Sequence, residues 1–178
     1  MPGRAGHPRP SITLMQGIGP AVRPARLSDV PALVDLRMAN AEAHLALDPD
    51  VYRLPQREAV IEHFTAVLSD ATARNAVLVA EQRGQVVGMV EVLRLPEPPA
   101  HQILRPEPSA QIHTVVLGEA RGRGVGSALL DAADRWATEH GLSYLSAGIH
   151  HHNASAVRFY RRHGYAPSGT SWGRRPAV

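Results

Sequence analysis

The chain has 178 residues, of which 44% are hydrophobic and 20% are charged, and this balance fits one globular domain with a single core. It contains no cysteine, which excludes disulfides, thiolate metal sites and a cysteine nucleophile and favours a reducing, cytoplasmic location. The net charge of +3 and the pI of about 9.9 predict an anionic partner, but the arginines are scattered and aromatics are scarce, so we expect a small polyphosphate ligand and no nucleic acid.

The N-terminal segment 1–20 is rich in Pro, Gly and Arg and has no hydrophobic periodicity. We therefore expect a disordered tail at residues 1–20 and one domain at residues 21–178, with Met15 as an alternative start. No apolar run in the chain approaches the roughly 20 residues of a membrane helix, so we expect no membrane partner.

The first half of the domain has the pattern of a strand followed by two helices. Residues 21–26 are the expected first strand. Ser28-Asp29 has the chemistry of a helix N-cap, with Pro31 in the first turn, and this helix is expected to stop before Asp48-Pro49. A second helix is predicted at residues 56–69, because apolar residues there recur on one face.

The rest of the chain alternates strands and helices. The expected elements are strands at 76–81 and 86–93 joined by a hairpin turn at 82–85, a proline-rich loop at 95–108, a buried strand at 111–117, an amphipathic helix at 124–140, a strand at 142–150, a helix at 153–163, and one or two closing strands from Tyr165 onward. The order βααββ–loop–βαβαβ predicts an α/β fold with a mixed sheet and helices on both of its faces.

The turn Arg121-Gly122-Arg123-Gly124-Val125-Gly126 joins the buried strand to the start of the amphipathic helix. Unpaired amides and the helix dipole favour an anion there, glycines let a phosphate approach the backbone, and the two arginines add positive charge. The dinucleotide pattern G-x-G-x-x-G fails in both registers, because its last position falls on Ser127 or Leu129. A P-loop is excluded because the sequence contains no Gly-Lys-Ser/Thr.

This turn, R-x-x-G-x-G after a hydrophobic strand, resembles the pyrophosphate loop of the GNAT superfamily of N-acetyltransferases. Val116 matches the apolar residue at which the family's preceding strand ends, while Gly118 stands where the family usually has Pro. Downstream, the family's order of motif residues is matched by Asn153, Phe159-Tyr160 and Gly164-Tyr165. The two blocks span about residues 111–166, and the order of the elements before them matches the family from Ala21 onward, so only the N-terminal tail lies clearly outside the resemblance. The resemblance implies a mostly antiparallel, twisted sheet that splays at its middle strands.

The resemblance implies transfer of the acetyl group of acetyl-CoA to a primary amine, by direct attack in a ternary complex. Pantetheine is expected in the gap between the strand that ends in Thr114-Val115-Val116 and the strand that begins near Tyr144, with a backbone amide near Val116 holding the oxyanion. The implied cofactor-binding residues are Thr114, Val115, Val116, Arg121, Gly122, Arg123, Gly124, Val125, Gly126, Asn153 and Tyr160. Asn153 is expected either to contact the pantetheine arm or to cap the following helix.

Tyr160 is the predicted general acid that protonates the departing CoA thiolate. The general base stays open, because the positions at which family members often have Glu are Ala110 and Ile112. His113 has a suitable imidazole, provided that a strand bulge lets it face the site, and a structural role is its alternative. Glu91 on a neighbouring strand is the second candidate for the base.

The run His150-His151-His152 is predicted to be a polar strand end without a metal, because adjacent strand residues point to alternate faces and cannot converge on one ion. His44, Asp48, Asp50 and Tyr52 lie in the joint between the first two helices, which in the family shapes the acceptor site. The two carboxylates there suit a cationic amine, and they also suit a capping role.

Two other functions are compatible with the sequence. The chain could be an acyl-CoA-binding module without catalysis, which acts as a sensor or a partner domain. A nucleic-acid-binding protein is suggested by the high pI alone. A homodimer is compatible with the family resemblance, and no sequence feature demonstrates it.

Overall fold

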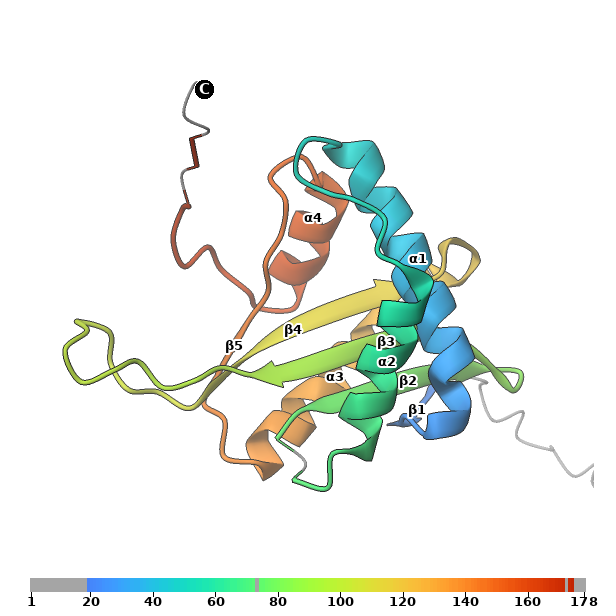
Figure 1. Ribbon diagram of the computed structural model, residues 1–178, viewed down its shortest axis with the longest axis horizontal. Helices are drawn as coiled ribbons and strands as arrows, with labels where there is room; N and C mark the ends of the chain where they lie inside the picture. The colour runs from blue at the N-terminus through green and yellow to red at the C-terminus, as the bar shows by residue number, and fades with distance from the viewer. Residues whose placement is uncertain (1–18, 73, 172, 175–178) are drawn as a thin grey trace, which may run out of the picture.

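The fold is one five-stranded sheet covered by helices, seen in a computed structural model that describes residues 19–72, 74–171 and 173–174 (Figure 1). The strands are β1 (Ala21–Pro24), β2 (Ala76–Gln82), β3 (Gln85–Arg94), β4 (Ser109–Val116) and β5 (Tyr144–Ser146). The helices are α1 (Val30–Leu47), α2 (Arg57–Ser69), α3 (Val125–Glu139) and α4 (Ala154–Arg162), with 3₁₀ turns η1 (Leu27–Asp29) and η2 (Gly118–Ala120). The tail expected at 1–20 and the alternative start at Met15 lie outside the described residues, except for Gly19 and Pro20.

The sheet has the order β1-β2-β3-β4-β5, and its first four strands pair antiparallel. The β2–β3 hairpin is tight because Arg83 and Gly84 both take positive φ, 52° and 78°, as a two-residue hairpin turn requires. β4 and β5 pair in parallel, because helix α3 carries the chain back across the sheet between them. The predicted mixed, mostly antiparallel sheet is confirmed.

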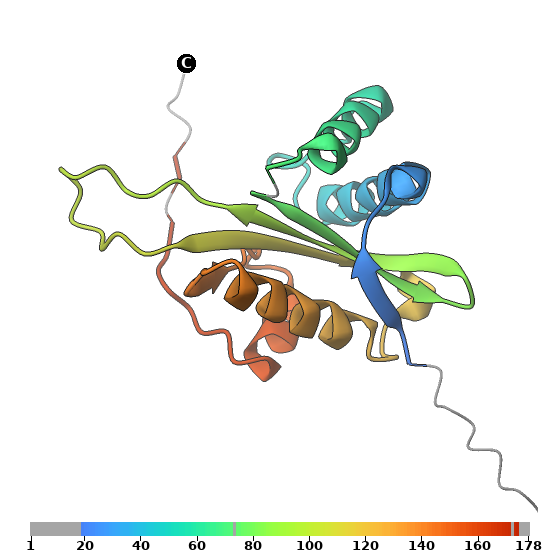
Figure 2. The ribbon, with the colours of Figure 1, turned by 90° about the horizontal axis from the view of Figure 1, so that it is seen from below.

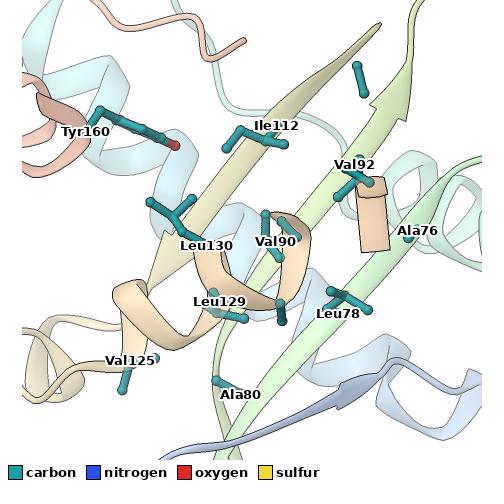
Figure 3. Packing of buried hydrophobic residues seen from close by; sticks show 14 of the residues in the cluster. Ala76, Leu78, Ala80, Val90, Val92, Ile112, Val125, Leu129, Leu130 and Tyr160 are labelled. Carbon is teal, nitrogen blue, oxygen red and sulfur yellow. The ribbon is translucent and has the colours of Figure 1, made fainter. Parts of the chain in front are cut away.

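Helices α1 and α2 cover one face of the sheet, and α3 and α4 cover the other (Figure 2). Strand side chains alternate between these two layers. On β4, for example, Val115 packs in the α1–α2 layer, whereas Ile112 packs in the α3–α4 layer. Figure 3 shows the second layer, where Leu129 and Leu130 of α3 meet the strands and Tyr160 of α4 reaches toward β4.

Two expectations for the C-terminal third are wrong. The strand expected at 142–150 is only Tyr144–Ser146, because β5 pairs with β4 over three residues and then leaves the sheet. No closing strand follows Tyr165 among residues 165–171 and 173–174. Pro167 and Gly169 interrupt that segment, and both residue types are poor strand formers.

The remaining predicted helices and strands are present, with ends that differ by at most two residues. The loop at 95–108 contains no helix or strand, as expected. Within the part of the chain that the structure describes, no helix has both the length and the apolar character needed to cross a membrane.

Candidate active site

The edge of β4 that faces β5 is open along most of its length. β5 pairs only with Ser109, Ala110 and Gln111, whereas β3 pairs with β4 as far as Val116. Among the described residues, the segment 112–116 therefore has a strand neighbour on one side alone. The expected splay between these strands is confirmed, and it leaves backbone groups of β4 available to an extended ligand.

Tyr160 of α4 stands beside this open edge (Figure 3). Its residue is 8% exposed, and its ring makes edge contacts with Phe159 and Tyr165, both at 5.2 Å between centroids. Burial raises the pKa of Tyr160, and Thr114 offsets part of that rise. The phenol therefore keeps its proton at neutral pH.

Thr114 is the residue of β4 that affects the pKa of Tyr160. Its Oγ1 is buried and makes no hydrogen bond of good geometry among the described residues, although the Tyr160 hydroxyl is near enough for hydrogen bonding with Thr114 to lower the pKa of Tyr160. A buried hydroxyl without a partner is uncommon in folded proteins and calls for an explanation. A polar ligand entering along the open edge of β4 would supply the missing partner.

Asn153 and His163 hold α4 in place. Asn153 Oδ1 accepts a hydrogen bond from the Ala156 amide at 3.1 Å, so the capping alternative predicted for Asn153 is present. At the other end of α4, His163 contacts the Phe159 carbonyl through Nδ1 at 2.8 Å and the Ser127 hydroxyl through Nε2 at 2.9 Å. The sequence analysis missed His163, which ties α4 to the first turn of α3.

The glycine-rich turn offers backbone without side chains. Gly122 and Gly124 have φ of +73° and +79°, and a Cβ atom added to either would meet nothing within 4 Å. Helix α3 starts at Val125 with no side-chain cap, so the amides of its first turn have no intrahelical partner. Gly126 serves packing instead, because a Cβ there would lie 2.9 Å from Cζ of Phe159.

The two arginines of this turn differ in their contacts. The Arg121 Nε donates to the Val116 carbonyl at 3.1 Å and thus ties the turn to the end of β4. Arg123 is exposed. Together with the helix dipole, the guanidinium groups make the start of α3 favourable for an anion.

A buried carboxylate lies on the opposite face of β4, beneath α1 and α2. Glu91 of β3 is fully buried and forms an ion pair with Arg37 of α1 and a hydrogen bond of 3.1 Å with His63 Nε2 of α2. Burial alone would raise the pKa of Glu91, but the His63 hydrogen bond and the charge of Arg37 outweigh it and leave the pKa lowered. Glu91 is therefore a paired carboxylate and a weak base.

His113 sits directly opposite Glu91 across the β3–β4 ladder, with its Nδ1 3.9 Å from a Glu91 oxygen. Burial lowers the pKa of His113, Glu91 raises it, and Arg37 and His44 lower it, with a net decrease. Its side chain is 39% exposed, so a neutral imidazole is open to solvent on this face. The pairing of β3 with β4 has no irregularity, so the bulge considered from the sequence is absent and simple strand alternation sets the facing of His113.

Arg37 and His63 were not predicted as site residues. A signal existed, because Arg37 follows Leu33 and Val34 on the apolar stripe of α1, and Glu91 interrupts the apolar run of β3. Two opposite charges on surfaces that must pack together indicate a buried pair. Sequence spacing alone does not reveal which helix covers which strand.

The geometric reason for dismissing His150, His151 and His152 is wrong. These residues follow β5 in a turn rather than a strand, and one nitrogen from each lies within 4.8 Å of the others. The His150 Nε2 is 3.2 Å from Asp48 Oδ2, and its ring contacts Tyr52, which in turn contacts His44. Three of the residues expected at the joint between α1 and α2 therefore meet the histidine turn. The fourth, Asp50, donates its backbone amide to Asp48.

Comparisons with known proteins identify the family and the fold. Residues 39–165 match the model of the acetyltransferase (GNAT) family. The chain is 34% identical over 70 residues to YwnH of Bacillus subtilis (strain 168), named a "putative phosphinothricin acetyltransferase", and this match covers 39% of the chain and 40% of YwnH, less than half of either.

Solved structures share the fold across almost their whole length. The BH1408 protein of Bacillus halodurans, in a tetramutant form, superposes with a TM-score of 0.75 at 19% identity, covering 88% of this chain and 99% of that one. Aminoglycoside N-acetyltransferase AAC(6')-Iy in complex with CoA gives 0.68 at 17% identity, covering 93% and 99%. Ribosomal-protein-alanine N-acetyltransferase from Brucella melitensis biovar Abortus 2308 gives 0.64 at 23% identity, covering 87% and 99%. At these identities the likeness shows the fold alone, but the family match spans most of the sequence, and the chain belongs to the GNAT acetyltransferase family.

Proposed function

We propose that the protein transfers an acetyl group from acetyl-CoA to a primary amine, with both substrates bound at once. The observation that carries this proposal is the open edge of β4, where Thr114 and the buried Tyr160 lie together. This edge leads to a helix start at which Gly122 and Gly124 leave the backbone uncovered. A long ligand with a polar arm and a pyrophosphate at its end matches both features.

The residues present fit CoA. The amides at the start of α3 and the guanidinium groups of Arg121 and Arg123 suit the pyrophosphate. The strand segment Thr114–Val116 suits the pantetheine arm through backbone pairing, and the Thr114 Oγ1 offers it a further hydrogen bond. When bound, acetyl-CoA supplies an acyl group already activated as a thioester. The proposed cofactor-binding set is that of the sequence analysis, with Val125, Gly126 and Asn153 acting by shaping the loop and α4.

Tyr160 is the proposed general acid. Its raised pKa keeps the phenol protonated, and it lies at the open edge where the thioester sulfur is expected. Donation of its proton to the departing thiolate prevents the reverse attack. The proton taken from the amine restores the phenol through solvent at the end of the cycle.

His113 is the proposed general base. Its lowered pKa leaves the imidazole neutral near pH 7, so it can accept a proton from an ammonium acceptor before attack. Glu91, paired with Arg37 and His63, does not serve as the base and instead steadies the charge beside His113. Because His113 faces the α1–α2 layer and Tyr160 the α3–α4 layer, the amine approaches from the α1–α2 side.

The acceptor is an amine whose identity the site does not name. Relatives on this fold carry names that refer to phosphinothricin, aminoglycosides and a ribosomal-protein alanine, and all three offer an amine. The side chains on the acceptor side include the imidazoles of His44, His113 and His150. The charged groups of Arg37 and Asp48 lie beside them. Acceptors that carry both an amine and a carboxylate or phosphinate therefore head the panel to be tested.

The test measures CoA release from acetyl-CoA with a panel of amines, for the wild type, Tyr160→Phe and Tyr165→Phe. Tyr165 is the matched control, because its hydroxyl is buried without a partner among the described residues and its ring touches Tyr160. We expect Tyr160→Phe to lower kcat by roughly 10²-fold or more, the range of general acid catalysis. Tyr165→Phe should keep most of the turnover. If the protein binds acetyl-CoA but releases no CoA in the presence of any amine, it is instead an acyl-CoA-binding module without catalysis.

A further inference from the structure

The turn between β5 and α4 carries three consecutive histidines to which the acetyl-transfer proposal gives no catalytic or cofactor-binding role. The rings of His150, His151 and His152 lie 3.9 to 5.1 Å apart between centroids. His150 is nearly buried, with 9% of its side chain exposed, while His151 and His152 are exposed to solvent. We infer that these three side chains form a binding site for one divalent transition-metal ion of the zinc, cobalt and nickel class.

The distances suit such an ion. One ring nitrogen from each histidine lies within 4.8 Å of the other two. Zinc–imidazole bonds of about 2.0–2.1 Å at tetrahedral angles place ligand nitrogens roughly 3.3 Å apart. The nitrogens therefore need to approach by about 1.5 Å at most, which rotation of the two exposed rings provides. Three imidazoles leave a fourth position for water or another ligand.

Asp48 supplies an independent sign of a built site. It lies at the end of α1, 102 residues away in sequence, and its Oδ2 is 3.2 Å from the His150 Nε2. The His152 amide donates a long hydrogen bond of 3.4 Å to the His150 Nδ1, so this nitrogen carries a lone pair and the Nε2 carries the proton that faces Asp48. A metal ion bound at Nδ1 would replace the His152 amide as the partner of that lone pair.

This arrangement is the one that metal-binding histidines use. A ligand histidine almost always donates its second ring nitrogen to a carboxylate or a carbonyl, which fixes the tautomer and the ring orientation. Tyr52 adds a second restraint, because its ring packs edge-on against His150 at 5.6 Å. Three neutral nitrogen donors without a carboxylate ligand favour zinc, cobalt, nickel or copper over magnesium or calcium. The inference does not depend on acetyl transfer.

The test is a titration of the untagged full chain with Co²⁺, followed by the visible absorption of the bound ion and by displacement with Zn²⁺. We expect one Co²⁺ per chain, released by one equivalent of Zn²⁺. The double variant His151→Ala/His152→Ala should lose this binding while keeping the wild-type melting temperature, because both side chains are exposed. Asp48→Asn should weaken binding by roughly 10–100-fold, as loss of an orienting carboxylate does.

The control is His101→Ala/His140→Ala, which also removes two exposed histidines and leaves the turn intact. It should bind Co²⁺ as the wild type does. Binding that is no tighter in the wild type than in His151→Ala/His152→Ala overturns the site. An equal loss in the control overturns it as well, since the signal would then come from scattered histidines. An unchanged affinity in Asp48→Asn overturns the role of Asp48.

Discussion

Replacing Gly124 by alanine tests whether the glycine-rich turn is shaped for a ligand rather than for packing. Gly124 has a φ of +79°, and an added Cβ atom would have no neighbour within 4 Å. The substitution therefore creates no clash inside the protein. Its two effects are backbone strain and a methyl group in the open space beside the start of α3.

The strain has a known size. A non-glycine residue in the left-handed region costs about 1–2 kcal/mol. For a domain of this length, each kcal/mol lowers Tm by about 2–4 °C, so Gly124→Ala should melt roughly 2–8 °C below the wild type. Acetyl-CoA at about 100 times its Kd stabilises the wild type by about 2.7 kcal/mol. A tenfold loss of affinity removes about 1.4 kcal/mol of this ligand stabilisation, which is close to half of it. The ligand-induced rise in Tm should therefore fall to about half of the wild-type rise.

The assay is thermal unfolding with and without acetyl-CoA, in which each variant is compared with its own ligand-free Tm. Gly118→Ala is the matched control, because Gly118 is an exposed residue just before the turn, its φ is not positive, and a Cβ there also meets nothing within 4 Å. Gly118→Ala should keep the full ligand-induced rise and a Tm at or above the wild-type value. If Gly124→Ala also keeps the full rise, the turn does not hold the pyrophosphate.

Three further predictions concern the face of β4 beneath α1 and α2 and the start of α4. Glu91→Gln removes the charge that raises the pKa of His113, so the acidic limb of kcat/KM against pH should move to lower pH; a limb that stays in place excludes His113 as the base. Arg37→Gln removes a charge that lowers the pKa of His113, so the acidic limb should move to higher pH. The pH–rate profiles of the two variants should therefore shift in opposite directions. Asn153→Ala removes the cap of α4 and should cost about 1 kcal/mol, seen as a Tm about 2–4 °C lower; an unchanged Tm means that the cap is dispensable.

The sequence was sufficient for the parts of the fold that local patterns determine. The helix α3 and the turn before it follow from an amphipathic stripe that begins after closely spaced glycines, and the β2–β3 hairpin follows from Gly84 between two β-branched runs. The position of Tyr160 beside β4 was reached through the family resemblance, since a nine-residue helix does not reveal what it packs against.

The sequence was insufficient where long-range pairing decides the structure. The segment 142–150 was expected to be one strand, but only three of its residues pair with β4, so the histidines fall in a turn, where their ring nitrogens lie close together. Glu91 of β3 contacts Arg37 of α1 and His63 of α2, which are 54 and 28 residues away from it in sequence. Contacts of this kind depend on which helix covers which strand, and strand alternation predicts only the face.

The most direct test of acetyl transfer is a mass measurement of both products from one reaction, the free CoA and the acetylated amine. The chain suits this test because it contains 19 arginines and no lysine. Acetylation of its own lysines therefore cannot consume acetyl-CoA. We predict that at least one amine of the panel is acetylated in a 1:1 ratio with the CoA released, and that Tyr160→Phe slows both products together. Tight binding of acetyl-CoA with no acetylated amine from any member of the panel would contradict the proposed function.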